Sequence, residues 1–446
     1  MKTDYLIVGA GVSGLTAALT IKSVHADANI TLLDAASEPG GLLRSVGFDE
    51  HPSLHFDLGT HIPELTSNQA LNALVFPEEV IKHWQRLSEL KVGNFFNGQL
   101  NQQSQFLNVS KDESIFCQAL VELLQTQPSE MADYLNLEEF LIARYGQALT
   151  QQVFKPLIFK MTAVELKELV PQTINFYGLA RIALGNRQIG LNLKQIPHLD
   201  QALAFNQDSE RPRQSTWVYP GEQGVGEWVK TLYQQCLDKN VKFEFNQRLE
   251  QTVKLRDGYE IRLISGDQIT ADKLIWTLPF YTGLSGGQQT RFVSRSIAIY
   301  HFTSQYAPNT ACHYIYCQQA AFHSYRLTFY DNVAPKNATQ PYRTTVEVIY
   351  DGEKPEPKII QQELVEMGLF SSPESIQVAG ITTVPYGFPV PVVAQQQIQH
   401  SLFKEVAIQN PDVVFTGRGK PGLFFTTDVL LDVYQQTSKL ASVKGG

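Results

Sequence analysis

The N-terminal part of the chain alternates between short apolar runs and a longer segment with helical spacing. Residues 6–8 are a continuous apolar run, which is typical of a strand buried on both faces. Residues 13–24 have helical patterning, and residues 30–33 form a second apolar run. This order predicts a strand, a helix and a second strand, which is the arrangement of a parallel βαβ unit.

Three glycines and one acid in this unit have the spacing of a dinucleotide-binding site. Gly9, Gly11 and Gly14 allow a tight turn, close approach of a pyrophosphate and close packing of the helix. The helix N-terminus then directs its N–H groups at the phosphates. Asp34 ends the second run, where it can accept hydrogen bonds from ribose hydroxyls and would repel the 2′-phosphate of NADP. The alternative is a glycine-rich turn as found in any α/β protein. It is disfavoured because the strand, the helix and the acid all have the positions expected of a dinucleotide-binding unit.

The rest of the chain changes its pattern twice. Residues 66–210 have mainly helical patterning, with apolar positions at helical spacing in residues 137–160. Residues 291–395 are rich in Tyr, Phe, Thr and Val and contain alternating runs, which predict an antiparallel sheet. Near the C-terminus, a strand over residues 413–418 precedes a helix over residues 429–438.

Length and composition indicate a folded protein with two domains. The chain has 446 residues, of which 43% are hydrophobic and 18% are charged, so disorder is not expected beyond the last few residues. The formal net charge is -8, and the main basic cluster is the pair Arg211 and Arg213. Nucleic acid is therefore not an expected partner. We expect a small-molecule substrate instead, and the oligomeric state stays open.

Cysteines and apolar stretches bear on the compartment of the protein. The four cysteines are scattered and form no C-x-x-C pair, so neither a disulfide nor a metal site is expected. The first strand begins near Asp4, which leaves no room for a signal peptide. Since no apolar stretch reaches about 18 residues, no transmembrane helix is expected. These features predict a soluble, cytoplasmic protein.

Motifs along nearly the whole chain resemble one superfamily of flavoproteins. They lie at residues 34–44, 56–61, 139–156, 219–228, 273–279 and 415–428. In this order they resemble the motifs of flavin amine oxidases, protoporphyrinogen oxidases and UDP-galactopyranose mutases. In that group the glycine pair that follows the acid, here Gly40 and Gly41, runs beside the pyrophosphate and ribityl chain of FAD. The resemblance therefore implies FAD as the cofactor.

The resemblance also implies an α/β fold with two domains. A Rossmann-type, glutathione-reductase-like FAD-binding domain would be assembled from the discontinuous segments 1–65, 211–290 and 396–446. A mixed α+β substrate domain would combine the helical residues 66–210 with the antiparallel sheet of residues 291–395. This second domain is expected to cover the reactive ring of the flavin.

Contacts to FAD are implied for residues from each segment of the FAD-binding domain. Val253 corresponds to the place where relatives pack an apolar side chain on adenine. The helix that opens at Asp428 would aim its N-terminus at the flavin and stabilise the negative charge of the reduced form. The residues expected to bind FAD are Gly9, Gly11, Val12, Ser13, Gly14, Asp34, Ala35, Gly40, Gly41, Leu42, Arg44, Gly59, Thr60, Val253, Thr277, Gly417, Arg418, Thr427, Asp428 and Val429.

His61 is the candidate catalytic residue. It follows a segment that is similar to the family's L-G-x-H motif, and in the mutases this histidine lies near the N5 region of the flavin. The resemblance therefore implies a polar group beside the reactive part of the cofactor. A structural role for His61 is the alternative.

The chain departs from the galactopyranose mutases at residues that hold a nucleotide sugar. Where the mutases have Arg, Tyr and Asp, this chain has Leu423, Phe424 and Thr426. Loss of a cationic clamp removes charge-assisted hydrogen bonds worth about 1.5–3 kcal/mol each. We therefore expect an FAD-dependent oxidoreductase that transfers hydride from a substrate C–H bond to flavin N5. Two alternatives remain: a flavin-dependent, mutase-like enzyme in which reduced flavin is the nucleophile, and a non-catalytic flavin-binding scaffold.

Overall fold

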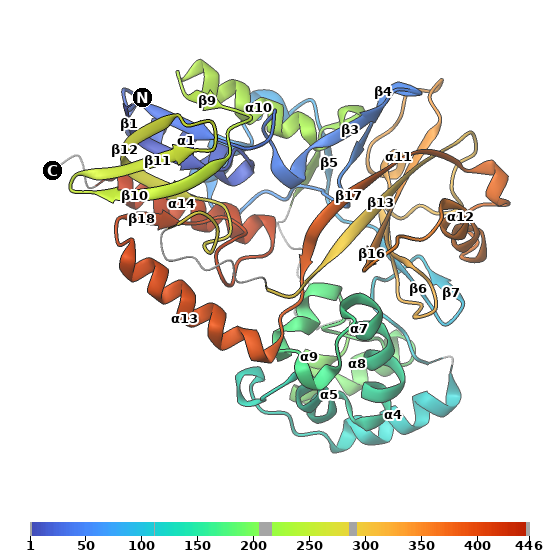
Figure 1. The fold of residues 1–446 in the computed structure, drawn as a ribbon. Coiled ribbons are helices and arrows are strands. Elements are labelled where there is room, and N and C mark those ends of the chain that lie inside the picture. Colours follow the sequence, from blue (N-terminus) through green and yellow to red (C-terminus); the bar gives the residue numbers. More distant parts are fainter. Residues whose placement is uncertain (1, 111, 205–215, 285–291, 443–446) are drawn as a thin grey trace.

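The first of two large sheets contains the predicted βαβ unit (Figure 1). The structure is a computed structural model, which describes residues 2–110, 112–204, 216–284 and 292–442. The first sheet has the strand order β10-β11-β12-β1-β2-β9, and β18 also pairs with β12. Its strands are β1 (Lys2–Val8), β2 (Ile30–Leu33), β9 (Lys242–Glu244), β10 (Leu249–Leu255), β11 (Gly258–Leu263), β12 (Gln268–Trp276) and β18 (Val413–Phe415).

Parallel pairing in the middle of this sheet brings distant parts of the chain together. β1 pairs in parallel with β2 and β12, β2 pairs with β9, and β12 pairs with β18. The sheet thus takes its strands from three separate chain segments. The proposed domain limits near residues 210 and 290 fall within 205–215 and 285–291, which lie outside the described residues.

Helices cover both faces of the first sheet, because its central strands are apolar on both sides. Ile7 belongs to a core with residues of α1 (Val12–Val24), α2 (Gln69–Val75), α10 (Gly226–Asp238) and α14 (Thr426–Ser442). Leu6, on the opposite face, belongs to a core that includes Val406 of α13 (Val393–Gln409). A sheet with parallel central strands and helices on both faces has the doubly wound arrangement, to which β10 and β11 add an antiparallel edge. The predicted α/β fold class is therefore confirmed.

The second large sheet is antiparallel except for one pair. Its strand order is β17-β13-β16-β15-β14-β6-β7, and β6 pairs with β14 in parallel. Its strands are β6 (Val92–Phe96), β7 (Gln99–Asn101), β13 (Ser294–Ser304), β14 (Tyr314–Cys317), β15 (Ser324–Phe329), β16 (Tyr342–Tyr350) and β17 (Gln377–Pro389). One face packs against α12 (Pro357–Glu366), through Ile360 and Leu364.

A block of helices packs on the other face of the second sheet (Figure 1). Phe140, Tyr145 and Phe154 of this block share one apolar core with Tyr325 and Phe388 of the sheet. The helices are α4 (Glu113–Gln125), α5 (Leu137–Tyr145), α6 (Gln147–Leu149), α7 (Lys155–Thr162), α8 (Arg187–Leu193) and α9 (Pro197–Ala202), with a π-helical turn over Thr150–Phe154. The shorter elements that connect these layers are α3 (Glu78–Ile81), α11 (Tyr330–Val333), β3 (Ser45–Phe48), β4 (His51–Asp57), β5 (Gln85–Leu87) and β8 (Trp217–Tyr219).

Residues 66–210 contain the predicted helices, but they also contain three short strands that their pattern does not predict. β5, β6 and β7 fall in this range, and β6 joins the second sheet beside β14. These strands are only three to five residues long, and β7 is at the sheet edge. Strands this short owe their conformation to their partners rather than to a local pattern. In the part of the chain that the structure describes, no helix is long and apolar enough to cross a membrane.

His301 on β13 makes the stability of the fold depend on pH. The side chain is fully buried between the hydroxyls of Thr345 and Thr382, at 3.2 and 3.1 Å, and burial lowers its pKa to about 3. Since an unfolded histidine titrates near 6.5, stability is complete above that pH and falls as the pH drops toward 3. Between about pH 7 and pH 5, we expect the wild type to lose about 2 kcal/mol more unfolding free energy than His301→Gln. Urea unfolding at both pH values measures this difference, and equal losses would contradict it.

Ala163 ends α7 in a backbone conformation that favours glycine. Its φ is 55°, and its N–H donates to the carbonyl oxygen of Phe159 at 2.7 Å. A side chain in this left-handed region costs about 1 kcal/mol. We expect Ala163→Gly to raise the free energy of unfolding by about 0.5–1 kcal/mol in a denaturant titration. Ala143→Gly is the matched control, since it lies inside α5 and should lower the same quantity by about 1 kcal/mol.

Candidate functional site

Three strands of the first sheet end side by side and bring glycines from distant segments together. Val8, Trp276 and Phe415 are in register, so the residues that follow them meet at the carboxyl edge of the sheet. A Cβ on Gly9 would lie 2.2 Å from Oγ1 of Thr277, which itself donates to the carbonyl oxygen of Val8 at 2.8 Å. Ligands of doubly wound sheets bind at this edge.

Gly417 approaches the same place from the C-terminal segment. Its φ is 82°, and a Cβ would lie 3.0 Å from the carbonyl oxygen of Thr277 and 3.3 Å from Oγ of Ser13. The structure thus brings together Gly9, Ser13, Thr277 and Gly417, four of the residues proposed to bind the cofactor.

The N-terminus of α1 is open for an anion. The helix begins after Gly11, whose φ is −72°, and no side chain within the described residues caps it. The first N–H groups of a helix have no partner inside the helix, and they carry the positive end of its dipole. A phosphate at this position would accept hydrogen bonds from them.

Gly11 and Gly14 are required for different reasons. A Cβ on Gly14 would lie 1.9 Å from the carbonyl oxygen of Gly9, so packing inside the protein already demands glycine there. A Cβ on Gly11 would meet only the carbonyl oxygen of Gly40, at 4.0 Å, among the described residues. Neither packing nor backbone strain demands glycine at position 11, and the preference for glycine at an N-cap is worth only about 1 kcal/mol. An external group that approaches the backbone does explain it, so the residues present fit the pyrophosphate of a dinucleotide.

The second glycine pair lies against this turn. Gly40 forms a bridge with Gly11, and its N–H donates to the carbonyl oxygen of Ala10 at 2.9 Å. The next residues turn away through Gly41, whose carbonyl oxygen accepts from Nε of Arg44 at 3.1 Å. Leu42 is half-buried within this turn, and Arg44 forms an exposed ion pair with Glu38. In this structure the Arg44 guanidinium contacts Glu38 and the carbonyl oxygen of Gly41, and its contact with FAD stays a prediction.

Asp34 lies at the end of β2 and organises the backbone around it. Oδ2 accepts from the N–H of Ala10 at 2.7 Å, and Oδ1 accepts from the N–H of Ala36 at 2.8 Å. Each carboxylate oxygen can accept a further hydrogen bond. Beside it is a cavity of about 340 Å³, lined by Ala35, Asn246, Gln247, Arg248, Ile264 and Ser265. This cavity is the proposed place of the adenosine end of the cofactor.

Val253 is not at this end of the sheet, so the prediction for it is wrong. In the register of the sheet Val253 pairs with Glu260, Glu260 with Thr270, and Thr270 with Lys2 at the start of β1. The turn at Gly9 follows the other end of β1. In addition, β10 and β9 are opposite edges of the sheet. The segment that approaches Ala35 is Asn246 to Arg248, directly after β9.

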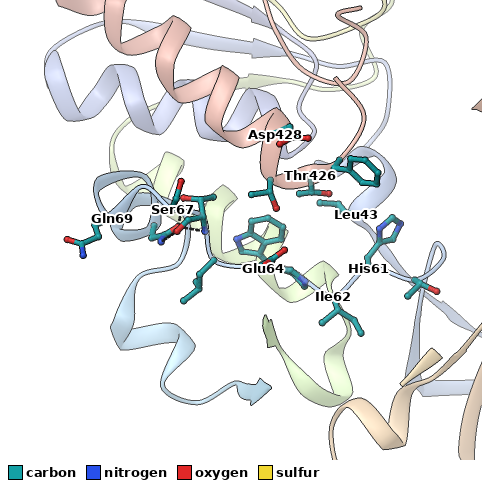
Figure 2. Close-up of a pocket in the computed structure, with 16 residues that line it drawn as sticks. Leu43, His61, Ile62, Glu64, Ser67, Gln69, Thr426 and Asp428 are labelled. Carbon is teal, nitrogen blue, oxygen red and sulfur yellow. Dashed lines mark hydrogen bonds between the residues drawn. The ribbon is translucent and has the colours of Figure 1, made fainter. Parts of the chain in front are cut away.

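A larger cavity of about 990 Å³ lies at the N-terminus of α14 (Figure 2). Figure 2 shows Thr426 and Asp428 at the start of this helix near Leu43, with His61 and Glu64 on the segment opposite. The residues that line the cavity are Leu43, Thr60, His61, Ile62, Pro63, Glu64, Leu65, Thr66, Ser67, Gln69, Asn72, Trp228, Phe425, Thr426, Thr427 and Asp428. Glu64 and Trp228 were not predicted, since no local motif marks a residue that reaches a cavity from another layer.

Two residues predicted at this end lie differently. Val429 has its side chain in the core, and its N–H donates to the carbonyl oxygen of Phe425 at 3.0 Å. It does not line the larger cavity, and its contact with FAD stays a prediction. Arg418 donates to the carbonyl oxygen of Gly387 at 3.2 Å, and its guanidinium lies 4.9 Å from the ring centroid of Phe424. It does not line the larger cavity.

His61 faces the larger cavity as a neutral imidazole. Its Nε2 lies 3.1 Å from the carbonyl oxygen of Leu58, and a carbonyl can only accept, so Nε2 carries the proton. Burial lowers the pKa of His61 to about 4, despite the opposing effect of the Glu347 carboxylate, and nearby Arg326 lowers it further. The lone pair on Nδ1 is therefore available near neutral pH.

Known proteins share both the sequence pattern and the fold. Residues 12–316 match the family described as flavin containing amine oxidoreductase. Comparison with curated protein sequences gives no match. A solved structure of reduced UDP-galactopyranose mutase is similar with a TM-score of 0.72 at 17% identity, covering 99% of this chain and 96% of that chain.

Two further structures show how widely this fold is used. Putrescine oxidase bound to putrescine is similar with a TM-score of 0.61 at 11% identity, covering 100% of this chain and 99% of that chain. A CLA-producing fatty acid isomerase from P. acnes is similar with a TM-score of 0.60 at 13% identity, covering 99% and 98%. Identities this low show the fold alone. The family match over most of the chain shows more: this protein belongs to the flavin-containing amine oxidoreductases and is an FAD-dependent enzyme.

Proposed function

We propose that the enzyme oxidises a C–H bond of a small organic substrate beside FAD bound along the carboxyl edge of the first sheet. The observation that carries this proposal is the open approach to Gly11, next to the uncapped N-terminus of α1. In this proposal Gly9 to Gly14 and Gly40 hold the pyrophosphate, and Asp34 and Arg248 face the adenosine. The larger cavity takes the reactive end.

The residues around the larger cavity would have separate tasks. Bound FAD supplies the hydride acceptor. Backbone N–H groups at Thr426 to Asp428, at the positive end of the α14 dipole, would stabilise negative charge in that cavity. Neutral His61 would orient the substrate or accept its proton through Nδ1.

The apolar residues at positions 423 and 424 favour oxidation of a small organic substrate over chemistry on a nucleotide sugar. Phe424 packs against Phe176 and Phe388, with ring centroids 4.7 and 6.1 Å apart. Leu423, the preceding residue, packs against the apolar core of the first sheet. Neither position offers a cation to hold a diphosphate. Tyr177, which stacks on Phe388 at 5.2 Å, belongs to the same buried apolar core.

A substrate screen under anaerobic conditions tests the proposal. Purified FAD-bound enzyme is mixed with amines, cyclic compounds and other candidate C–H donors, and loss of the oxidised flavin absorbance marks a substrate. Oxygen or a dye should then restore the absorbance, with one acceptor consumed per substrate oxidised. Turnover of a nucleotide sugar by dithionite-reduced enzyme, without any acceptor, would instead establish the mutase-like alternative.

A further inference from the structure

The segment from Gly59 to His61 is held from the second sheet by one buried carboxylate. Glu347 on β16 is 4% exposed. Its Oε1 accepts hydrogen bonds from the N–H of Thr60 at 3.0 Å and from Oγ1 of Thr60 at 3.1 Å. Thr60 and His61 both line the larger cavity, and Figure 2 shows His61 there. A residue on the second sheet therefore contacts this wall of the cavity directly.

Gly59 allows the close approach that this contact needs. Its φ is 111°, and a Cβ on it would lie 3.1 Å from the carboxyl carbon of Glu347. Any larger residue would be strained and would push the segment away from the carboxylate. The glycine and the buried acid thus act together on the position of Thr60.

Arg326 fixes the orientation of Glu347. The two residues are opposite each other on β15 and β16, and Nε and Nη2 of Arg326 donate to Oε1 and Oε2 at 2.7 and 2.9 Å. This is a bidentate, charge-assisted pair, which restricts the carboxylate in direction as well as in distance. Although burial favours the neutral acid, Arg326 and the N–H of Thr60 keep the pKa of Glu347 below its usual range.

We propose that Glu347, held by Arg326, is a positioning residue that sets the flavin end of the larger cavity through Thr60 and His61. The inference rests on the proposed cofactor site, and neither charged residue lines the cavity itself. A buried ion pair is by itself weak evidence of a stabilising role. Its contacts with the cavity wall are what point to a function: the carboxylate accepts both donors of Thr60 and also places a negative charge near His61.

Glu363 on α12 offers a matched control. It is 5% exposed and accepts hydrogen bonds from the N–H of His323 and Ser324 at 2.6 and 2.9 Å, and also from the Ser324 hydroxyl. It is therefore a buried glutamate that holds backbone next to the same sheet. It does not line either cavity.

The test compares Glu347→Gln with Glu363→Gln as purified, FAD-bound enzymes. Both should unfold at a lower temperature than the wild type. We expect only Glu347→Gln to shift the visible flavin spectrum and midpoint potential and to raise the Kd for FAD by about ten-fold. Wild-type values in Glu347→Gln, or equal changes in both variants, would overturn the inference.

A second variant covers the case in which Glu347→Gln does not fold. Thr328→Val removes the hydroxyl that contacts Oγ1 of Thr60 and leaves the ion pair in place. It should shift the flavin spectrum in the same direction by a smaller amount, and an unshifted spectrum contradicts the inference. If no substrate is found but the flavin spectrum shifts in Glu347→Gln and not in Glu363→Gln, only the proposed reaction is refuted. If a substrate is found but the spectra of the variants do not shift, only the positioning role is refuted.

Discussion

Gly11→Val is expected to reduce the affinity for FAD by at least about 100-fold while the protein stays folded. The valine side chain would occupy the space in front of α1 where a Cβ meets, of all residues with described positions, only the carbonyl oxygen of Gly40. Its backbone conformation, with a φ of −72° and a ψ of 178°, suits valine, so only about 1 kcal/mol of capping preference is lost. Titration of the apo-protein with FAD, followed by flavin fluorescence, measures the affinity.

Gly14→Ala is the control that separates binding from folding. Its Cβ would lie 1.9 Å from the carbonyl oxygen of Gly9, so the helix must shift and the free energy of unfolding should fall by about 3 kcal/mol. If Gly11→Val binds FAD stoichiometrically with wild-type affinity, the assigned pyrophosphate position is wrong. If it loses as much stability as Gly14→Ala, packing rather than a ligand explains the glycine.

His61→Ala is expected to keep FAD bound but to slow reduction of the flavin by substrate on the order of 100-fold. Among the described residues the imidazole hydrogen-bonds only to the carbonyl oxygen of Leu58, so its loss should leave the proposed phosphate and adenosine contacts intact. Loss of the Nδ1 lone pair removes the proposed proton acceptor. Stopped-flow measurement of the anaerobic half-reaction gives the rate constant.

A surface histidine provides the reference for this measurement. His83 is exposed after α3 and lines neither cavity, so His83→Ala should retain the wild-type rate constant. An unchanged rate in His61→Ala, with FAD still bound, would assign His61 a structural role.

The N-terminal unit could be predicted from the sequence because its signals are local. The apolar runs at 6–8 and 30–33 are buried on both faces, so composition alone distinguishes them from amphipathic segments. The glycines between them are determined by the turn itself. The structure extends the first strand back to Lys2 and leaves the order of elements unchanged.

Residues whose role depends on pairing between distant segments could not be predicted in this way. Val253 is an apolar residue of a strand, but its position along the strand direction follows from the register of β10 with β11 and of β11 with β12. Arg326 and Glu347 are polar positions in alternating strands, which read as solvent-facing. Their burial follows from the pairing of β15 with β16, which places Arg326 opposite Glu347, and from the segment at Thr60 that contacts Glu347.

Assembly of the first sheet from three chain segments has a consequence for biosynthesis. Gly9 and Gly417 lie against the same Thr277, although nearly the whole chain separates them. A ribosome-bound chain that ends before β18 has the turn from Gly9 to Gly14 but lacks Gly417 and the residues at the start of α14 that line the larger cavity. Such long-range closure is slow and late in folding. We therefore expect tight FAD binding only after the C-terminal helix has left the ribosome. Full-length chains should then contain FAD, and chains truncated before this helix should not bind it.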